Sequence, residues 1–139
     1  MTPINLPDDW GVSKSNQIKS RQRIDLVIIY KTWGHERFFN FKGLPASIAE
    51  KLMTGYPNIE PTDVQNDSPT AEEMIRIAKR HNGTLIGYVD VGNSPEFNNI
   101  SIQGFVIKAS PTTITNLKYR LRPTEFSEDK PGYWRYWWD

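Results

Sequence analysis

The chain has 139 residues, with 17 Lys and Arg against 16 Asp and Glu, and it contains no cysteine. This length is typical of one domain with a single hydrophobic core. The net charge of +1 gives no whole-chain argument for a polyanionic partner, and the lack of cysteine excludes disulfides, thiolate catalysis, iron–sulfur clusters and Cys-type zinc sites.

The first 22 residues differ in character from the rest. They contain two prolines and few apolar residues, and they end in a basic polar run. We therefore expect an N-terminal arm over 1–22, mobile or covering a sheet edge, followed by one α+β domain over 23–139. The start lacks the pattern of a signal peptide, and the longest apolar run, Leu26 to Tyr30, is far too short to span a membrane. These features predict a soluble, cytoplasmic protein without a membrane partner.

The next segment predicts a β-hairpin. Residues from Ile24 to Trp33 are apolar and rich in β-branched side chains, and Phe39 and Phe41 alternate with polar residues after a turn at Gly34. A short helix follows, opened by Pro45, with its apolar residues on one face and a stop near Gly55.

Two further helices have clear start signals. Ser68-Pro69-Thr70 is followed by Glu72 and Glu73, which predicts a capping hydroxyl and acidic residues in the first helical turn. Ser110 and Pro111 repeat this opening, and Pro123 ends the third helix.

The remaining apolar segments predict strands. Thr84–Val91 and Ile100–Ala109 are expected to pair antiparallel, and residues 133–139 are expected to add a closing strand. Gly87 and Gly104 lie inside these strands, where glycine signals a bulge or a close approach by another group. The predicted order is ββααββαβ, with about three helices, and we expect an α+β two-layer sandwich with a mostly antiparallel sheet built from two hairpins plus the C-terminal strand.

Catalytic and metal-binding motifs are absent from the sequence. His35-Glu36-Arg37 places a histidine beside a carboxylate, but on a strand these two side chains point to opposite faces. The His-Glu-x-x-His pattern fails because position 39 is Phe. We therefore predict no catalytic residue, no cofactor and no metal, although a small enzyme or ligand-binding protein with this triplet at a cleft rim remains an alternative.

The C-terminal segment has the most unusual composition. Three of the five tryptophans and two of the six tyrosines lie in residues 133–138. If Trp134, Tyr136 and Trp138 pack under helices, then Tyr133, Arg135 and Trp137 form the opposite row, and these residue types dominate interface hot spots. The competing interpretation is that both rows are core.

These observations lead to a preferred function and one macromolecular alternative. The preferred prediction is a non-enzymatic adaptor or inhibitor-like module that binds a protein partner through Tyr133, Arg135 and Trp137, with Asp63 and Asp67 setting its electrostatic preference. Self-association through the last strand, giving a homo-oligomer, extends this prediction. The alternative is nucleic-acid binding by a basic arm with aromatic stacking, using Lys14, Lys19, Arg21 and Arg23.

Overall fold

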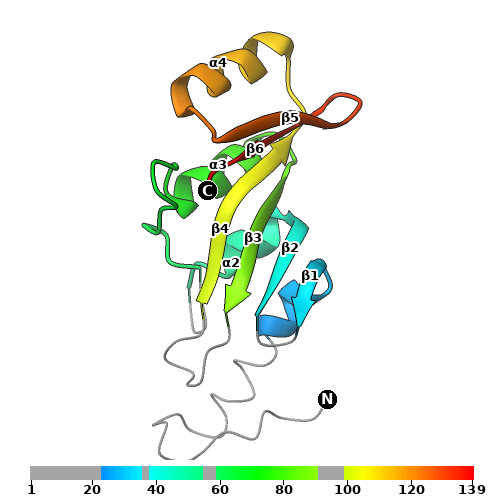
Figure 1. Cartoon of the computed structure of the whole chain (residues 1–139), viewed down its shortest axis with the longest axis vertical. Helices are drawn as coiled ribbons and strands as arrows, with labels where there is room; N and C mark the ends of the chain where they lie inside the picture. Colours follow the sequence, from blue (N-terminus) through cyan, green and yellow to red (C-terminus); the bar gives the residue numbers. More distant parts are fainter. Residues whose placement is uncertain (1–22, 36–37, 55–58, 91–98) are drawn as a thin grey trace, which may run out of the picture.

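The computed structural model describes residues 23–35, 38–54, 59–90 and 99–139, which form a curled antiparallel sheet with helices packed against it (Figure 1). Within these residues the sheet has six strands in the order β1-β2-β3-β4-β6-β5, and each strand pairs antiparallel with its neighbours. The α+β class is therefore confirmed. The strands are β1 (Lys31–His35), β2 (Phe38–Pro45), β3 (Thr84–Asp90), β4 (Asn99–Ile107), β5 (Glu125–Lys130) and β6 (Tyr133–Trp137).

The strand predicted from Ile24 is wrong in its first part, because residues 23–28 are helical and β1 begins only at Lys31. Ile24 and Val27 are buried and Ile28 is partly buried, whereas Leu26 and Ile29 are exposed. Burial at i, i+3 and i+4 is the spacing of a helix face. This packing outweighs the strand preference of the β-branched residues, and it brings the number of helices in the described part of the chain to four.

The three predicted helices are present, with their predicted starts. They are α2 (Ala46–Lys51), α3 (Ala71–Arg80) and α4 (Pro111–Leu121). The Thr70 hydroxyl accepts a hydrogen bond from the Glu73 N–H at 3.1 Å, and the Ser110 hydroxyl accepts one from the Thr113 N–H at 3.2 Å. Both bonds satisfy N–H groups that a helix cannot pair internally, so local sequence fixes where these two helices begin.

The main core lies between the sheet and α2 and α3, both of which contact the central strands. Side chains from β2, β3 and β4 alternate toward the helices, as the two-residue period of a strand requires. The fully buried strand residues include Phe39, Leu85, Val89, Ile102 and Phe105, and the helices contribute Ala49, Met74, Ile75 and Ala78.

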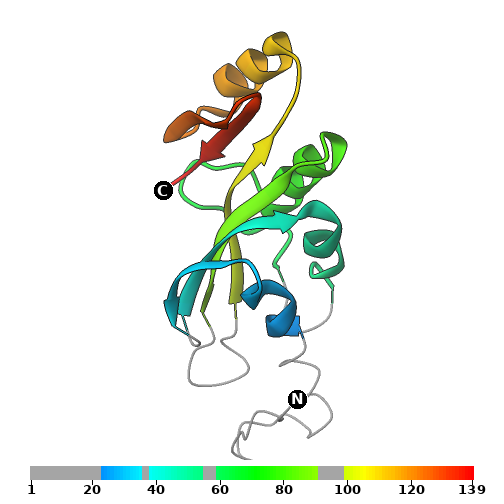
Figure 2. The ribbon, with the colours of Figure 1, turned by 90° about the vertical axis from the view of Figure 1, so that its right-hand side faces the viewer.

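The C-terminal part forms a hairpin rather than one closing strand, because β5 precedes β6 and pairs with it. Helix α4 lies over one face of this hairpin (Figures 1 and 2). The Tyr136 hydroxyl donates to the Ile114 carbonyl oxygen at 2.6 Å, and the Trp138 indole N–H donates to the Leu121 carbonyl oxygen at 3.2 Å. Two buried aromatic side chains, Tyr136 and Trp138, are thus each hydrogen-bonded to α4.

With this extra helix and extra strand, the predicted order of elements and the two-layer sandwich are not confirmed. Instead, the sheet curls, and the β5–β6 hairpin crosses the end of β4 (Figure 1). In the described part of the chain, no helix is long and apolar enough to span a membrane.

Candidate binding site

The candidate site is the concave face of the sheet, the face that turns away from α2 and α3. Ile86 of β3 and Val106 of β4 are buried on this face, although neither belongs to the core cluster beneath the helices. Val106 is paired with Arg135 of β6, and directly opposed residues in an antiparallel ladder point to the same side. The concave face therefore has its own small apolar centre, with polar and aromatic side chains around it.

Bulges shape this face. Within the described residues, the strand register shifts at four places, and each shift leaves one strand with an extra residue. The shifts fall at or beside Thr32, Lys42, Gln103 and Asp129. Bulges bend a sheet and redirect a side chain, and they are common next to binding sites.

The larger of two cavities on this face has a volume of about 340 Å³. Three of the bulge residues, Thr32, Lys42 and Gln103, line it. Trp137 and Arg135 close it from β6, and Asn40 adds an amide from β2. The cavity therefore combines one large aromatic wall with several hydrogen-bonding groups.

A second cavity, of about 190 Å³, adjoins the first, and Lys42 lines both. Tyr133 and Val106 form its aromatic and apolar walls, and Asp129 and Lys130 line it from β5. The Lys130 ammonium lies 4.4 Å from the centre of the Tyr133 ring and covers its face.

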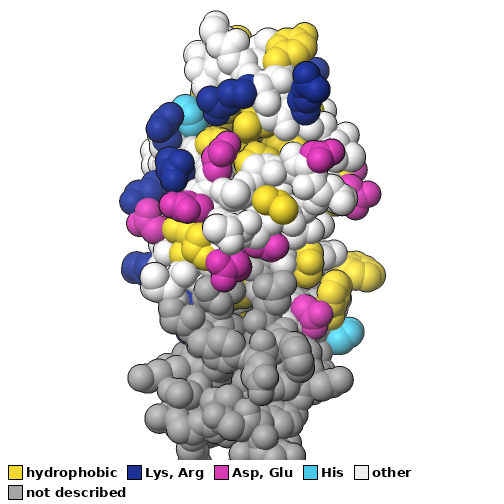
Figure 3. Space-filling model, turned by 90° about the vertical axis from the view of Figure 1, so that its left-hand side faces the viewer, with side chains coloured by type: hydrophobic (Ala, Val, Ile, Leu, Met, Phe, Trp, Pro, Cys, Tyr) yellow, Lys and Arg dark blue, Asp and Glu magenta, His cyan; other side chains and the backbone are white. Residues whose placement is uncertain are grey.

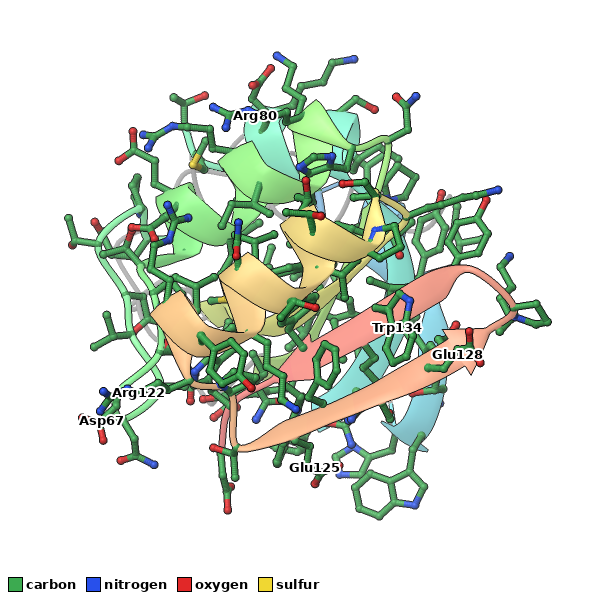
Figure 4. The ribbon with its side chains drawn as sticks, turned by 90° about the horizontal axis from the view of Figure 1, so that it is seen from above. Asp67, Arg80, Arg122, Glu125, Glu128 and Trp134 are labelled. Carbon is green, nitrogen blue, oxygen red and sulfur yellow. The ribbon has the colours of Figure 1, made fainter. Side chains whose placement is uncertain are left out.

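Two of the cations on the concave face form ion pairs, whereas Lys130 contacts the Tyr133 ring instead. Lys42 forms an ion pair with Asp129, and the Arg135 guanidinium lies 3.1 Å from a Glu125 oxygen. The Arg135 guanidinium also sits 5.5 Å from the centre of the Trp137 ring. These contacts hold Arg135 and Trp137 in place before any partner arrives. In Figure 4, Trp134 lies on the α4 side of the hairpin, whereas Glu125 points away from α4.

The predicted C-terminal row is thus brought together on one side of β6. Tyr136 and Trp138 are fully buried and Trp134 is partly buried against the core, whereas Tyr133, Arg135 and Trp137 are half-buried and line the two cavities. The row is therefore not fully buried, so the interpretation that both rows are core does not describe it.

The acidic residues predicted to accompany this row lie elsewhere. Asp63 and Asp67 belong to the segment before α3 and line neither cavity. The Asp63 carbonyl oxygen accepts the Ala71 N–H at 2.9 Å, so this residue helps to fix the start of α3. The neighbouring Asn66 amide bonds to the carbonyl oxygen of Asp139, which ties this segment to the chain end.

Of the basic residues predicted to bind nucleic acid, only Arg23 lies within the described residues. Lys14, Lys19 and Arg21 lie outside the described residues. The Arg23 guanidinium donates to the carbonyl oxygens of Leu52 and Thr54, and burial lowers the pKa of Arg23. These carbonyls follow the last turn of α2, so Arg23 has a structural use there.

The histidine triplet does not form a catalytic arrangement among the described residues. His35 is exposed on the edge strand β1, and Glu36 and Arg37 lie outside the described residues. No group of three or more His, Cys, Asp or Glu side chains in the described part of the chain is placed to hold a metal ion.

Sequence reasoning missed most of the polar lining, namely Thr32, Asn40, Lys42, Gln103 and Asp129. No spacing in the sequence links them, because they meet only when the sheet curls. The one local signal is Gly43, which has a positive φ of 79° directly after Lys42. That conformation favours glycine and commonly accompanies a bulge.

Comparison with known proteins gives no relative for this arrangement: neither a family model, nor a curated protein, nor a solved structure matches the chain. The function must therefore be argued from the site itself.

Proposed function

We propose that this chain is a non-enzymatic binding module that receives an extended segment of a partner protein on its concave face. One observation carries the proposal: Trp137, Arg135 and Tyr133 come from one strand and line two adjoining cavities. Trp, Tyr and Arg are the residues that contribute most to binding energy when they sit in sheltered pockets.

The size of the cavities favours side chains of a peptide over a bulky cofactor. The larger cavity, about 340 Å³, lies at the low end of the range for small-molecule sites, and the smaller one is below that range. Two small neighbouring cavities suit two side chains projecting from one extended segment. The hydroxyl and amides of Thr32, Asn40 and Gln103 then offer partners for its backbone.

The electrostatics favour a segment without strong net charge. Lys42 is balanced by Asp129, and Arg135 is balanced by Glu125. A basic segment competes with Lys42 and Arg135 for their carboxylates, whereas an apolar or aromatic side chain packs against Trp137 and leaves both pairs intact. Lys130 adds one positive charge, which lies over the Tyr133 ring. Because Arg135 is already held over the Trp137 ring, less side-chain conformational entropy is lost when a segment binds.

The test begins with selection of binders to the full chain from a random peptide library displayed on phage. Selected peptides are then titrated by calorimetry against the wild-type protein and the variants Trp137→Ala and Tyr133→Ala. We expect each substitution to weaken binding about tenfold or more, because each removes an anchor in a sheltered cavity. The control is Ile29→Ala, which shortens an apolar side chain that is 74% exposed and lines neither cavity, and it should bind as the wild type does.

A second variant distinguishes loss of the site from loss of the fold. Thr32 is exposed on β1 and lines the larger cavity, so Thr32→Trp fills this cavity without removing a core contact. This variant should keep the wild-type circular dichroism spectrum and lose peptide binding. Peptides that bind all variants equally would contradict the proposal, and so would a library that yields no binder to the full chain.

A further inference from the structure

A second hollow lies between α3 and α4, and it shares no lining residue with the cavities of the concave face. Its volume is about 230 Å³. Helix α3 and its cap contribute Ile77, Arg80 and His81, and α4 contributes Thr113, Asn116, Leu117 and Arg120. We call this hollow the α3–α4 groove.

The spacing of these residues shows that each helix turns one stripe toward the groove. Positions 77, 80 and 81 are i, i+3 and i+4 on α3, and positions 113, 116, 117 and 120 follow the same rule on α4. Ile77 and Leu117 are nearly buried and form an apolar floor. The cationic and hydrogen-bonding side chains stand around this floor.

The charge of the groove is one-sided. Its lining includes two arginines and a histidine and no acidic residue. Other cations of α3 have carboxylate partners, since Lys79 pairs with Glu50 and Arg76 pairs with Glu72. Among the described residues, neither Arg80 nor Arg120 has such a partner. Figure 3 shows Lys and Arg side chains gathered around a histidine in this part of the surface.

The sequence around α4 is also basic, although Lys108 lies over the Tyr133 ring and Lys118 over the Phe126 ring rather than in the groove. Residues 108–124 contain four Lys or Arg and no Asp or Glu. The nearest acidic strand, β5, directs Glu125 to Arg135 and Asp129 to Lys42 on the concave face. The chain is therefore locally basic here although its net charge is only +1.

Helix dipoles explain part of this pattern. Arg80 and His81 lie at the C-terminal end of α3, where a positive charge is favourable. Arg120 likewise lies in the last turn of α4, where the dipole favours a positive charge. The dipoles do not explain why both helices direct these cations into one groove, because like charges that share a groove repel one another and an anion between them relieves that repulsion. The lining therefore fits an anionic ligand.

An exposed aromatic residue indicates which anion. Tyr119 is 72% exposed on α4, three residues after Asn116 and directly before Arg120. Tyr119 does not line the groove, but the next residue, Arg120, does. Tyr119 therefore lies on the flank of α4 next to the lining stripe, and its exposed ring is open to stacking. An aromatic ring beside unpaired cations is the combination that holds single-stranded nucleic acid, with the cations on phosphates and the ring under a base. A phosphorylated peptide has no need of the ring.

We propose that the α3–α4 groove binds single-stranded nucleic acid, with Arg80 and Arg120 contacting successive phosphates and Tyr119 stacking on a base. The Thr113 hydroxyl and the Asn116 amide add hydrogen bonds to the backbone of the strand. This site is distinct from the N-terminal arm and from the concave face.

The experiment measures fluorescence anisotropy of labelled oligo(dT) and oligo(rU), and of a DNA duplex of equal length, with the full chain across a series of salt concentrations. Arg80→Gln and Arg120→Gln should each weaken single-strand binding and reduce the slope of log K against log salt by about 0.7, because each removes one phosphate contact. Tyr119→Ala should weaken binding about tenfold and leave the slope unchanged, because stacking releases no counterions.

The matched control is Arg76→Gln. It makes the same change of charge on the same helix, but Arg76 lies outside the groove and pairs with Glu72. This variant should retain the affinity and the salt slope of the wild type. Binding to both oligo(dT) and oligo(rU) is expected, because the proposed contacts are with phosphates and with the flat face of a base, which DNA and RNA share.

Several results would overturn the proposal. One is no binding of either oligonucleotide at low salt, and another is duplex binding as tight as single-strand binding. A third is binding that persists in the groove variants but is lost when Lys14, Lys19 and Arg21 are replaced by Gln, which would assign it to the arm. Capture of a phosphoserine peptide without oligonucleotide binding would assign the groove to a different partner.

Discussion

Lys42 of β2 and Asp129 of β5 form an ion pair although β3, β4 and β6 lie between their strands in the sheet. A flat sheet with this strand order would hold the two side chains far apart, because neighbouring strands are about 4.8 Å from one another. The sheet must therefore curl strongly to bring these two side chains into contact. The ion pair lies on the concave face, at the point where the two cavities adjoin.

We expect this ion pair to contribute modestly to stability. Lys42 and Asp129 have side-chain exposures of 43% and 17%, so water screens the attraction in part. A double-mutant cycle with Lys42→Met and Asp129→Asn should give a coupling of roughly 0.5–1 kcal/mol in chemical denaturation at low salt, decreasing as salt rises. The more exposed pair Lys79–Glu50 is the control and should give a smaller coupling. A larger coupling for the control would contradict this account.

Gly104 should resist replacement because of its neighbours. A Cβ built there collides with the Tyr136 carbonyl oxygen and lies 3.0 Å from the Trp137 Cα. Gly104→Ala should cost roughly 3 kcal/mol in unfolding free energy, at the upper end of overpacking effects, and should shift tryptophan fluorescence. Gly43→Ala is the contrast: Gly43 has open space but a positive φ, so it should cost about 1 kcal/mol. Equal effects would show that close approach is not the cause.

Thr70 should stabilise α3 through its cap. Its hydroxyl accepts the Glu73 N–H, and Thr70→Ala leaves that donor without this partner. The expected loss in unfolding free energy is about 1 kcal/mol, measured by urea denaturation. Thr62→Ala removes a hydroxyl from the preceding segment, where it bonds only a nearby Glu60 carboxylate, and it should change stability little. A cost as large for Thr62 as for Thr70 would remove the capping explanation.

Tyr136 should make stability fall at alkaline pH. Burial raises the pKa of Tyr136 above its ordinary value of 10.0. The folded protein then keeps the phenol proton in a range where the unfolded chain loses it. This contribution to the unfolding free energy is complete below pH 10 and declines above it, by up to about 1.4 kcal/mol per pH unit.

Tyr136→Phe separates this effect from other alkaline effects. The substitution removes the 2.6 Å hydrogen bond to the Ile114 carbonyl oxygen and should cost about 1 kcal/mol at neutral pH. Above pH 10 its unfolding free energy should decline less steeply than that of the wild type, as followed by urea denaturation at several pH values. Parallel declines in both proteins would mean that other groups dominate.

Local signals in the sequence predicted part of this structure well. The caps at Thr70 and Ser110 and the prolines near them gave the starts of α3 and α4, because a cap depends only on residues within one turn. The tight surroundings of Gly87 and Gly104 were also predicted, and the sheet register shifts beside Gly87. The caps depend on residues within one turn, whereas the crowding at the two glycines comes from neighbouring strands and only its position is marked by the glycine itself.

The sequence was a poorer guide where tertiary packing decides. The β-branched composition of residues 24–28 predicts a strand, although Ile24, Val27 and Ile28 also fit a helix face. Strand β5 has the sequence EFSEDK, which is too charged to signal a strand and forms one by pairing with β6. The candidate site depends on bulges and on curling of the sheet, so Lys42 and Asp129 could not be linked from their positions in the chain.

Strand β6 contributes residues both to the concave face and to the contacts with α4. Arg135 and Trp137 line the larger cavity, whereas Tyr136 of the strand and Trp138, directly after it, anchor α4 by hydrogen bonds. Because successive side chains of a strand point to opposite faces, the residues that line the concave face and those that hold α4 alternate along the same short segment. That helix forms half of the α3–α4 groove. One segment, residues 133–138, therefore supplies both the lining of the concave face and the anchors of this helix.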